Sequence, residues 1–183
     1  PGVPTLLTLY DLIPIHFPEH STLKARLLFR WATALALRTA QHTLAISEAT
    51  RRDFLARFPL RPERITAIPL AADPAFTPQT PEVVAALRTR YSLPDKFLLY
   101  LGSNKPHKNL GRLIEAWAVV QAEAPDYTLV IAGAWLSQHP EPRQRVHALG
   151  IDNRVRWLGP LPDTDLPALY TAADAFIFPS LYE

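Results

Sequence analysis

Short apolar segments alternate with longer amphipathic segments along almost the whole chain of 183 residues. The short segments have the length of buried strands, and the longer ones repeat apolar residues at three- and four-residue spacing, as helices do. Strands separated by helices favour parallel sheets joined by right-handed crossovers. The expected strands cover 5–9, 42–46, 64–69, 96–101, 128–132, 154–158 and 175–178, and the expected helices 23–40, 48–58, 82–91, 109–124, 140–149 and 164–173. The sequence therefore predicts an α/β fold.

One segment interrupts this alternation. Residues 70–81, LAADPAFTPQTP, contain three prolines and little periodicity, which is typical of a connection between domains. We therefore expect two lobes, residues 1–77 and residues 78–183. Because the chain begins at Pro1, lacks methionine and ends directly after a strand-like run, we expect a fragment in which each lobe is incomplete; the alternative is a complete small protein.

Composition excludes some classes of protein. A hydrophobic content of 48% with 20% charged residues fits an ordinary globular protein, and no apolar run approaches the ~18 residues that a membrane span needs. Cysteine is absent, so disulfides and thiolate metal sites are excluded, which is compatible with a cytoplasmic location. A net charge of +2 and no interleaving of aromatic and basic residues argue against nucleic-acid binding.

Basic residues are concentrated in one region. Residues 20–65 contain nine Lys or Arg but three Asp or Glu. Such a face could bind an anionic membrane surface or a phosphorylated substrate. Binding to a membrane would be a peripheral contact at the inner membrane face. A solvated helix surface is the alternative.

The segment FLLYLGSNKPHKNLGRLIEAW joins a strand to a helix through a polar, basic loop. Ligands of open parallel sheets bind beyond the carboxyl ends of strands, near helix N-termini. Gly102 allows a tight turn, and Lys105, His107 and Lys108 add positive charge beside the positive end of a helix dipole. A diphosphate fits this loop, and a plain solvent-exposed turn is the alternative. The strand LVIAGA, which ends at Gly133, is a weaker candidate of the same kind.

Several familiar catalytic motifs are missing. There is no GxGxxG and no GxxxxGK[ST], which argues against a dinucleotide-dependent dehydrogenase and a P-loop NTPase. No HExxH or GxSxG is present either, so the chemistry is expected to depend on positioning and electrostatics. Asp163-Thr164-Asp165 could chelate a metal, but it precedes a helical pattern, and we interpret these aspartates as helix-capping residues, with no metal site.

Four stretches together resemble the retaining glycosyltransferases of family 4, which have the GT-B architecture of two Rossmann-like lobes. They are YLGSNKPHKNLGRLIEAW, LVIAG, RVRWLGPLPDTDLPALYTAADAFIFPSLYE and AISEATRRDFLARFPLRPERITAIPLAADPAF, and TLYDLIPIHFPE also resembles the N-terminal lobe. The similarity is greatest to mannosyltransferases of the O-antigen or cell-wall type, and thus to polysaccharide biosynthesis. It implies transfer of a hexosyl group from a nucleotide diphosphate sugar, GDP-mannose as the first guess, to a glycan or lipid-linked acceptor, without cofactor or metal.

The resemblance also implies roles for individual residues. Lys108 matches the family lysine that contacts the donor diphosphate, and Glu183 matches the first glutamate of the E-x7-E motif, which contacts the transferred sugar; the second glutamate lies beyond this chain. Leu158 to Leu161 are expected near the base through backbone groups. The remaining expected contacts are Gly102, Ser103, Lys105, Asn109 and Gly133 for the donor, and Tyr10 and Asp11 on the acceptor side or near the sugar.

Two positions depart from the family pattern. Tyr10 stands where the family often has histidine, and Ser103 stands where an arginine often follows the strand-end glycine. The diphosphate clamp would then depend on Lys108, aided by Lys105. A non-catalytic module that binds a nucleotide or phosphate stays open as the alternative function. A phosphorylase of similar plan would need a phosphate site or a cofactor lysine, and neither pattern is present.

Overall fold

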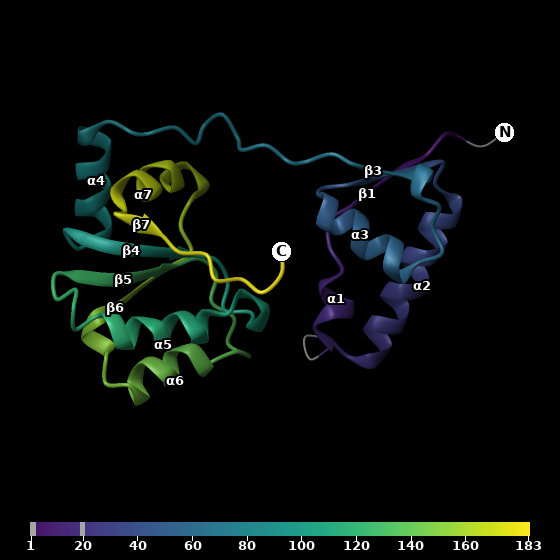
Figure 1. The fold of residues 1–183 in the computed structure, drawn as a ribbon. Coiled ribbons are helices and arrows are strands. Elements are labelled where there is room, and N and C mark those ends of the chain that lie inside the picture. Colours follow the sequence, from purple (N-terminus) through teal and green to yellow (C-terminus); the bar gives the residue numbers. More distant parts are fainter. Residues whose placement is uncertain (1–2, 19–20) are drawn as a thin grey trace. The chain divides into compact units, whose positions relative to one another are not determined.

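The computed structural model describes residues 3–18 and 21–183, and the chain forms two compact units, Pro1–Ala72 together with Glu183, and Asp73–Tyr182. Each unit has its own sheet, and every described strand pair is parallel (Figure 1). The predicted α/β class with two Rossmann-like regions is therefore confirmed.

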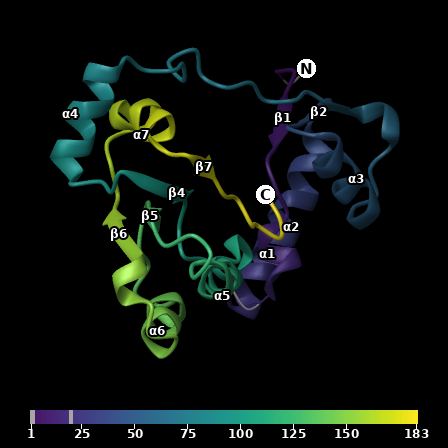
Figure 2. The same ribbon diagram turned by 60° about the vertical axis from the view of Figure 1, so that its left-hand side comes forward.

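The second unit contains a sheet of four strands in the order β6-β5-β4-β7. The strands are β4 (Lys96–Leu101), β5 (Tyr127–Ala132), β6 (Val155–Gly159) and β7 (Ala175–Phe176). The helices are α4 (Pro81–Tyr91), α5 (Leu110–Val120), α6 (Glu141–Ala148) and α7 (Leu166–Ala172). Figures 1 and 2 both show α4 and α7 on one face of this sheet and α5 and α6 on the other.

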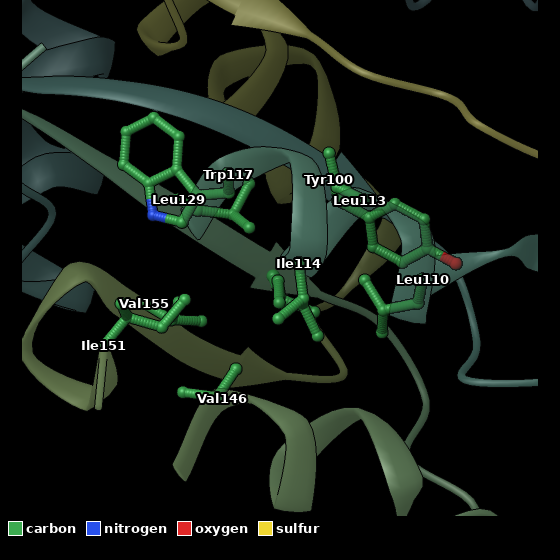
Figure 3. Packing of buried hydrophobic residues seen from close by; sticks show 10 residues of the cluster. Tyr100, Leu110, Leu113, Ile114, Trp117, Leu129, Val146, Ile151 and Val155 are labelled. Atoms are coloured by element: carbon green, nitrogen blue, oxygen red, sulfur yellow. The ribbon is translucent and has the colours of Figure 1, made fainter. Parts of the chain in front are cut away.

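Both faces of the central strands are apolar because both are covered by helices. On β4, Leu99 packs with α4 and α7, whereas Tyr100 packs with α5 and α6. The core cluster on the α5 side includes Leu113, Ile114 and Trp117 (Figure 3). These helix residues form the apolar face expected from the sequence, and their burial fixes the direction in which α5 leaves the sheet.

The first unit has three strands in the order β1-β2-β3: β1 (Leu6–Leu9), β2 (His42–Ala45) and β3 (Ile65–Ala67). Its helices are α1 (Ile13–His16), α2 (Leu23–Thr39) and α3 (Glu48–Arg57). Its core cluster joins strand residues such as Leu9 and Ile65 to Leu37 of α2 and Phe54 of α3. Ser47 caps α3, as predicted, because its Oγ accepts the Thr50 N–H at 3.0 Å.

Three details differ from the sequence expectations. The short helix α1 was not predicted. It contains Pro14, which usually interrupts a helix, but here the proline lies in the first turn, where its missing N–H costs nothing. The strand 5–9 was expected to be buried, but Leu6 of β1 is exposed. The helix α2 buries Leu37 but leaves much of its apolar surface exposed. The spacing of apolar residues thus predicted that a helix forms here but not how much of it is buried.

We predict that Ile114→Ala lowers the free energy of unfolding by about 2–5 kcal/mol, because it removes a fully buried side chain between α5 and the sheet. Val119→Ala on the exposed side of α5 is the matched control and should change it by less than about 0.5 kcal/mol. Denaturant unfolding measures both, and equal effects would contradict this account of the core.

Candidate functional site

Three glycines meet at the carboxyl edge of the second sheet. Gly102 follows β4 and donates its N–H to the Ala132 carbonyl at 2.9 Å, and Gly133 follows β5 and donates to the Gly159 carbonyl at 2.8 Å. Gly133 has φ of 113°, and a Cβ there would lie 2.4 Å from the Gly102 oxygen. The two strand-end loops can approach this closely only because Gly133 has no side chain.

The basic loop after β4 folds as a 3-10 turn, Pro106–Lys108, that leads into α5. The Lys108 N–H donates to the Lys105 carbonyl at 2.9 Å, and Asn109 adopts a left-handed conformation with φ of 58° before α5 begins. The first N–H groups of a helix have no intrahelical acceptor and carry the positive end of its dipole. The turn therefore places Lys108 directly beside the N-terminus of α5, as the sequence indicated.

The two lysines of this loop point to different surroundings. The Lys108 side chain is half-buried, and its ammonium lies 5.5 Å from the centroid of the Phe178 ring. The Lys105 side chain is exposed and lines a hollow of about 360 Å³ with Arg112 and Arg145, which Lys108 does not line. The diphosphate contact assigned to Lys108 and the assisting role assigned to Lys105 stay predictions, and the structure does not bring the two lysines into this one hollow.

The C-terminal segment packs against the same turn. The Leu181 N–H donates to the His107 carbonyl at 2.8 Å, and the Asn109 side-chain amide donates to the Pro179 carbonyl at 3.1 Å. Glu183 follows two residues later. Thus residues 179–181, which precede Glu183 in the chain, are fixed to the turn that carries Lys108, although they are more than 70 positions away in the sequence.

Asn104 is a residue of this region that the sequence did not single out. It is 4% exposed, and its side chain makes three hydrogen bonds to the loop after β5. Its amide nitrogen donates to the carbonyls of Leu136 at 2.8 Å and His139 at 2.6 Å, and its oxygen accepts the Leu136 N–H at 2.7 Å. Asn104 thereby joins the two strand-end loops. A polar residue in a polar loop gives no sequence signal for this burial.

Ser103, Leu158 and Leu161 are the remaining residues that were expected to contact the donor. The Ser103 carbonyl accepts a hydrogen bond from the Tyr100 hydroxyl at 2.7 Å. Leu158 and Leu161 are partly buried against the core cluster on the α4 and α7 side, so their side chains face the interior. Contact with a base through their backbone groups stays a prediction, as does any donor contact of Ser103.

In the first unit, Tyr10 and Asp11 follow β1 and lie next to the N-terminus of α3. The Thr50 hydroxyl of α3 donates to the Tyr10 carbonyl at 3.1 Å, and an Asp11 carboxylate oxygen accepts the Ile13 N–H at 2.9 Å. The Tyr10 side chain is 61% exposed. These residues thus lie at the carboxyl edge of their own sheet, where ligands of parallel sheets bind.

Asp165 lies at the N-terminus of α7, as predicted, but the prediction that its side chain caps this helix is wrong. Its side chain makes no capping hydrogen bond to α7; instead it accepts hydrogen bonds from the Arg90 guanidinium at 3.1 Å and from the Tyr91 hydroxyl, both on α4. The hydrogen bond to Asp165 raises the pKa of Tyr91. The carboxylate joins α4 to α7, and the described residues hold no group of three or more potential metal ligands.

Comparison with known proteins identifies both units. A family model described as glycosyl transferases group 1 matches residues 88–183, and one described as glycosyltransferase family 4 matches residues 1–76. The chain is 30% identical to the O-antigen chain mannosyltransferase B of Escherichia coli over 150 residues, 81% of this chain and 39% of that protein. It is also 30% identical to the serotype-specific mannosyltransferase WbdA of the same organism, over 98% of this chain and 23% of the relative.

A solved structure shows the same fold. The structure of Anabaena Alr3699/HepE in complex with UDP-glucose matches with a TM-score of 0.78 and 27% identity, over 97% of this chain and 47% of that one. The chain spans less than half the length of each of these three proteins.

We predict that Gly133→Ala lowers the free energy of unfolding by at least about 3 kcal/mol, because it combines an unfavourable φ with a clash against the Gly102 backbone. Gly150→Ala is the control: Gly150 also has positive φ, 64°, but an added Cβ meets no atom within 4 Å, so the cost should be about 1–2 kcal/mol. Thermal or denaturant unfolding compares them, and equal costs would rule out the close approach of the loops.

We also predict that Asn104→Ala accelerates amide hydrogen exchange at Leu136 at least tenfold, since the loop after β5 loses three hydrogen bonds, at about 0.5–1.5 kcal/mol each. Asn153→Ala, at an exposed asparagine of the same unit, is the control and should leave exchange in residues 133–140 unchanged. Unchanged exchange at Leu136 in the Asn104 variant would show that the asparagine does not hold the loop.

Proposed function

The chain belongs to the glycosyl transferases of group 1, and we propose that the full-length protein transfers a hexosyl group from a nucleotide diphosphate sugar to an acceptor hydroxyl with retention of anomeric configuration. The donor would bind to residues 78–183 and the acceptor to residues 1–77. The acceptor would be a glycan or a lipid-linked glycan. The observation that carries the proposal is the turn that holds Lys108 beside the N-terminus of α5 and against the segment leading to Glu183.

This turn suits a departing diphosphate. As the bond between the sugar and the diphosphate breaks, negative charge builds on the diphosphate oxygens. An ammonium group and free helix N–H groups that are already in place stabilise that charge without reorganising. In the proposed reaction Lys108 and α5 supply this stabilisation without a metal ion or cofactor. The half-buried position of Lys108 supports the role because a partly desolvated charge interacts more strongly than one in bulk water.

Glu183 would orient the sugar by accepting hydrogen bonds from its hydroxyls. Support comes from the hydrogen bonds that fix residues 179–181 to the Lys108 turn. GDP-mannose is the first candidate donor: the two Escherichia coli relatives are named mannosyltransferases, whereas the Anabaena structure contains UDP-glucose. Gly102, Gly133 and Asn109 would contribute by shaping the loops around the diphosphate.

On the acceptor side, we place Tyr10 and Asp11 near the transferred sugar. Tyr10 can donate a hydrogen bond through its exposed hydroxyl but cannot act as histidine does near neutral pH. Together with Ser103, which stands where a cationic residue is frequent, it favours a second candidate function, a non-catalytic module that binds a nucleotide. A donor-consumption assay on the full-length protein separates the two functions.

We predict that Lys108→Ala in the full-length enzyme lowers kcat/KM by about 100-fold or more, because one preorganised electrostatic donor is worth about 3 kcal/mol. Lys96→Ala, at the opposite end of β4, is the matched control and should retain the parent value within about twofold. The measurement is steady-state transfer with a radiolabelled or fluorescent acceptor. Unchanged turnover of the Lys108 variant would reject the diphosphate role, and a parent protein that consumes no donor would favour the non-catalytic module.

A further inference from the structure

Aromatic rings of the second unit form a continuous row of contacts that ends at Lys108. Phe76 lies in the connection, residues 70–81, Tyr170 on α7, Phe176 on β7, and Phe178 two residues later. Neighbouring ring centroids lie 5.9, 5.1 and 5.7 Å apart in that order, and the Lys108 ammonium lies 5.5 Å from the last centroid. Aromatic rings attract one another at these separations. This aromatic row therefore joins the connection to the turn that carries Lys108.

Backbone hydrogen bonds fix the start of the aromatic row. The Asp73 carbonyl accepts the Phe76 N–H at 2.9 Å, which closes a turn directly before the ring. Three residues later, the Gln79 N–H donates to the Thr171 hydroxyl of α7 at 3.1 Å. Phe76 is thus held on both sides, and its ring lies edge-to-face against Tyr170.

The extended chain at β7 fixes the far end of the row. Residues two apart on an extended chain point to the same side, which brings Phe176 and Phe178 into a stack with 28° between their ring planes. Ile177 between them points to the other side and packs against the α5 core cluster. A shift of this segment would therefore move the ring on which Lys108 lies.

We propose that Phe76 is a positioning residue for Lys108 and acts through the aromatic row. The proposal rests on the proposed function, in which Lys108 binds the donor diphosphate. A cation is attracted to the face of an aromatic ring, so the Phe178 ring helps to place the ammonium group. That ring is placed in turn by Phe176, Tyr170 and Phe76. A connection whose ring is seated on Tyr170 thus favours the lysine position that suits a diphosphate.

The expected coupling is small and works in both directions. One aromatic contact changes an equilibrium by about twofold to tenfold, and a row of contacts transmits no more than its weakest pair allows. Losing the Phe76 ring should therefore weaken donor binding by about threefold. Losing the Phe178 ring, which touches Lys108 itself, should weaken it by about fivefold to tenfold. Because coupling is reciprocal, a bound nucleotide diphosphate should favour the seated Phe76 to the same degree.

The first test follows the Lys108 amine in the full-length protein without any ligand. Lysines are reductively methylated with isotope-labelled formaldehyde, which keeps their charge, and the Lys108 NMR signal is assigned by its absence from Lys108→Arg. A ring shifts the signals of groups above its face upfield. We expect Phe178→Leu to remove this shift and Phe76→Leu to reduce it. Phe76 is 44% exposed, so the second variant should keep the core intact, and the signals of the other lysines check this.

Tyr127→Leu is the matched control. Tyr127 also contacts a lysine, with the Lys96 ammonium 5.8 Å from its ring centroid, but this contact lies at the opposite end of β4. The control should move the Lys96 signal and leave the Lys108 signal in place. Phe76→Tyr keeps a ring at the start of the aromatic row and should preserve the parent Lys108 signal.

The second test measures the affinities for GDP and UDP by titration calorimetry. Phe76→Leu should bind the preferred nucleotide about threefold more weakly, whereas Phe76→Tyr and Tyr127→Leu should bind it like the parent protein. An unchanged Lys108 signal in Phe76→Leu would overturn the proposal, and so would a moved signal with unchanged affinity. If the parent binds neither nucleotide while Phe76→Leu still moves the Lys108 signal, the proposed donor chemistry fails and the positioning of Lys108 by Phe76 stands.

Discussion

The close approach of two strand-end loops at the carboxyl edge of the second sheet is the constraint on which the candidate site depends. Gly133 has no side chain and adopts a positive φ, so the loop after β5 can lie against the Gly102 carbonyl. Asn104, which is itself buried, then joins the same two loops through three side-chain hydrogen bonds. Because the loop after β4 is held at Gly102 and at Asn104, the 3-10 turn that follows can present Lys108 at a fixed position beside α5.

The same turn also organises the segment that leads to Glu183. Backbone and amide hydrogen bonds tie residues 179–181 to His107 and Asn109, and the Lys108 ammonium lies over the Phe178 ring. A cation over an aromatic face is attracted to the ring, and more strongly when water is excluded, so this contact helps to orient the lysine. Orientation in advance of charge development is what electrostatic catalysis requires, and it connects the fold of residues 96–183 to the proposed transfer chemistry.

Much of this architecture could be predicted from the sequence because its signals are local. The alternation of segments indicated the strands, and the spacing of apolar residues in 110–117 predicted the buried face of α5. The anion site that the Lys-Pro-His-Lys loop indicated stays a prediction. What the sequence did not indicate depends on tertiary contacts. Asn104 looks like any loop residue until the loop after β5 encloses it, Asp165 finds its partners on a helix 75 positions away, and α2 shows the period of a buried helix while exposing its apolar side.

The central claim is that the turn containing Lys108 binds the diphosphate of an activated sugar. The most direct measurement is a crystal structure of the full-length protein with bound GDP or UDP. The account predicts a phosphate oxygen within hydrogen-bonding distance, about 2.7–3.2 Å, of the Lys108 ammonium nitrogen and of an N–H group in the first turn of α5. A diphosphate bound elsewhere, with Lys108 still over Phe178 and no phosphate at the turn, would contradict it.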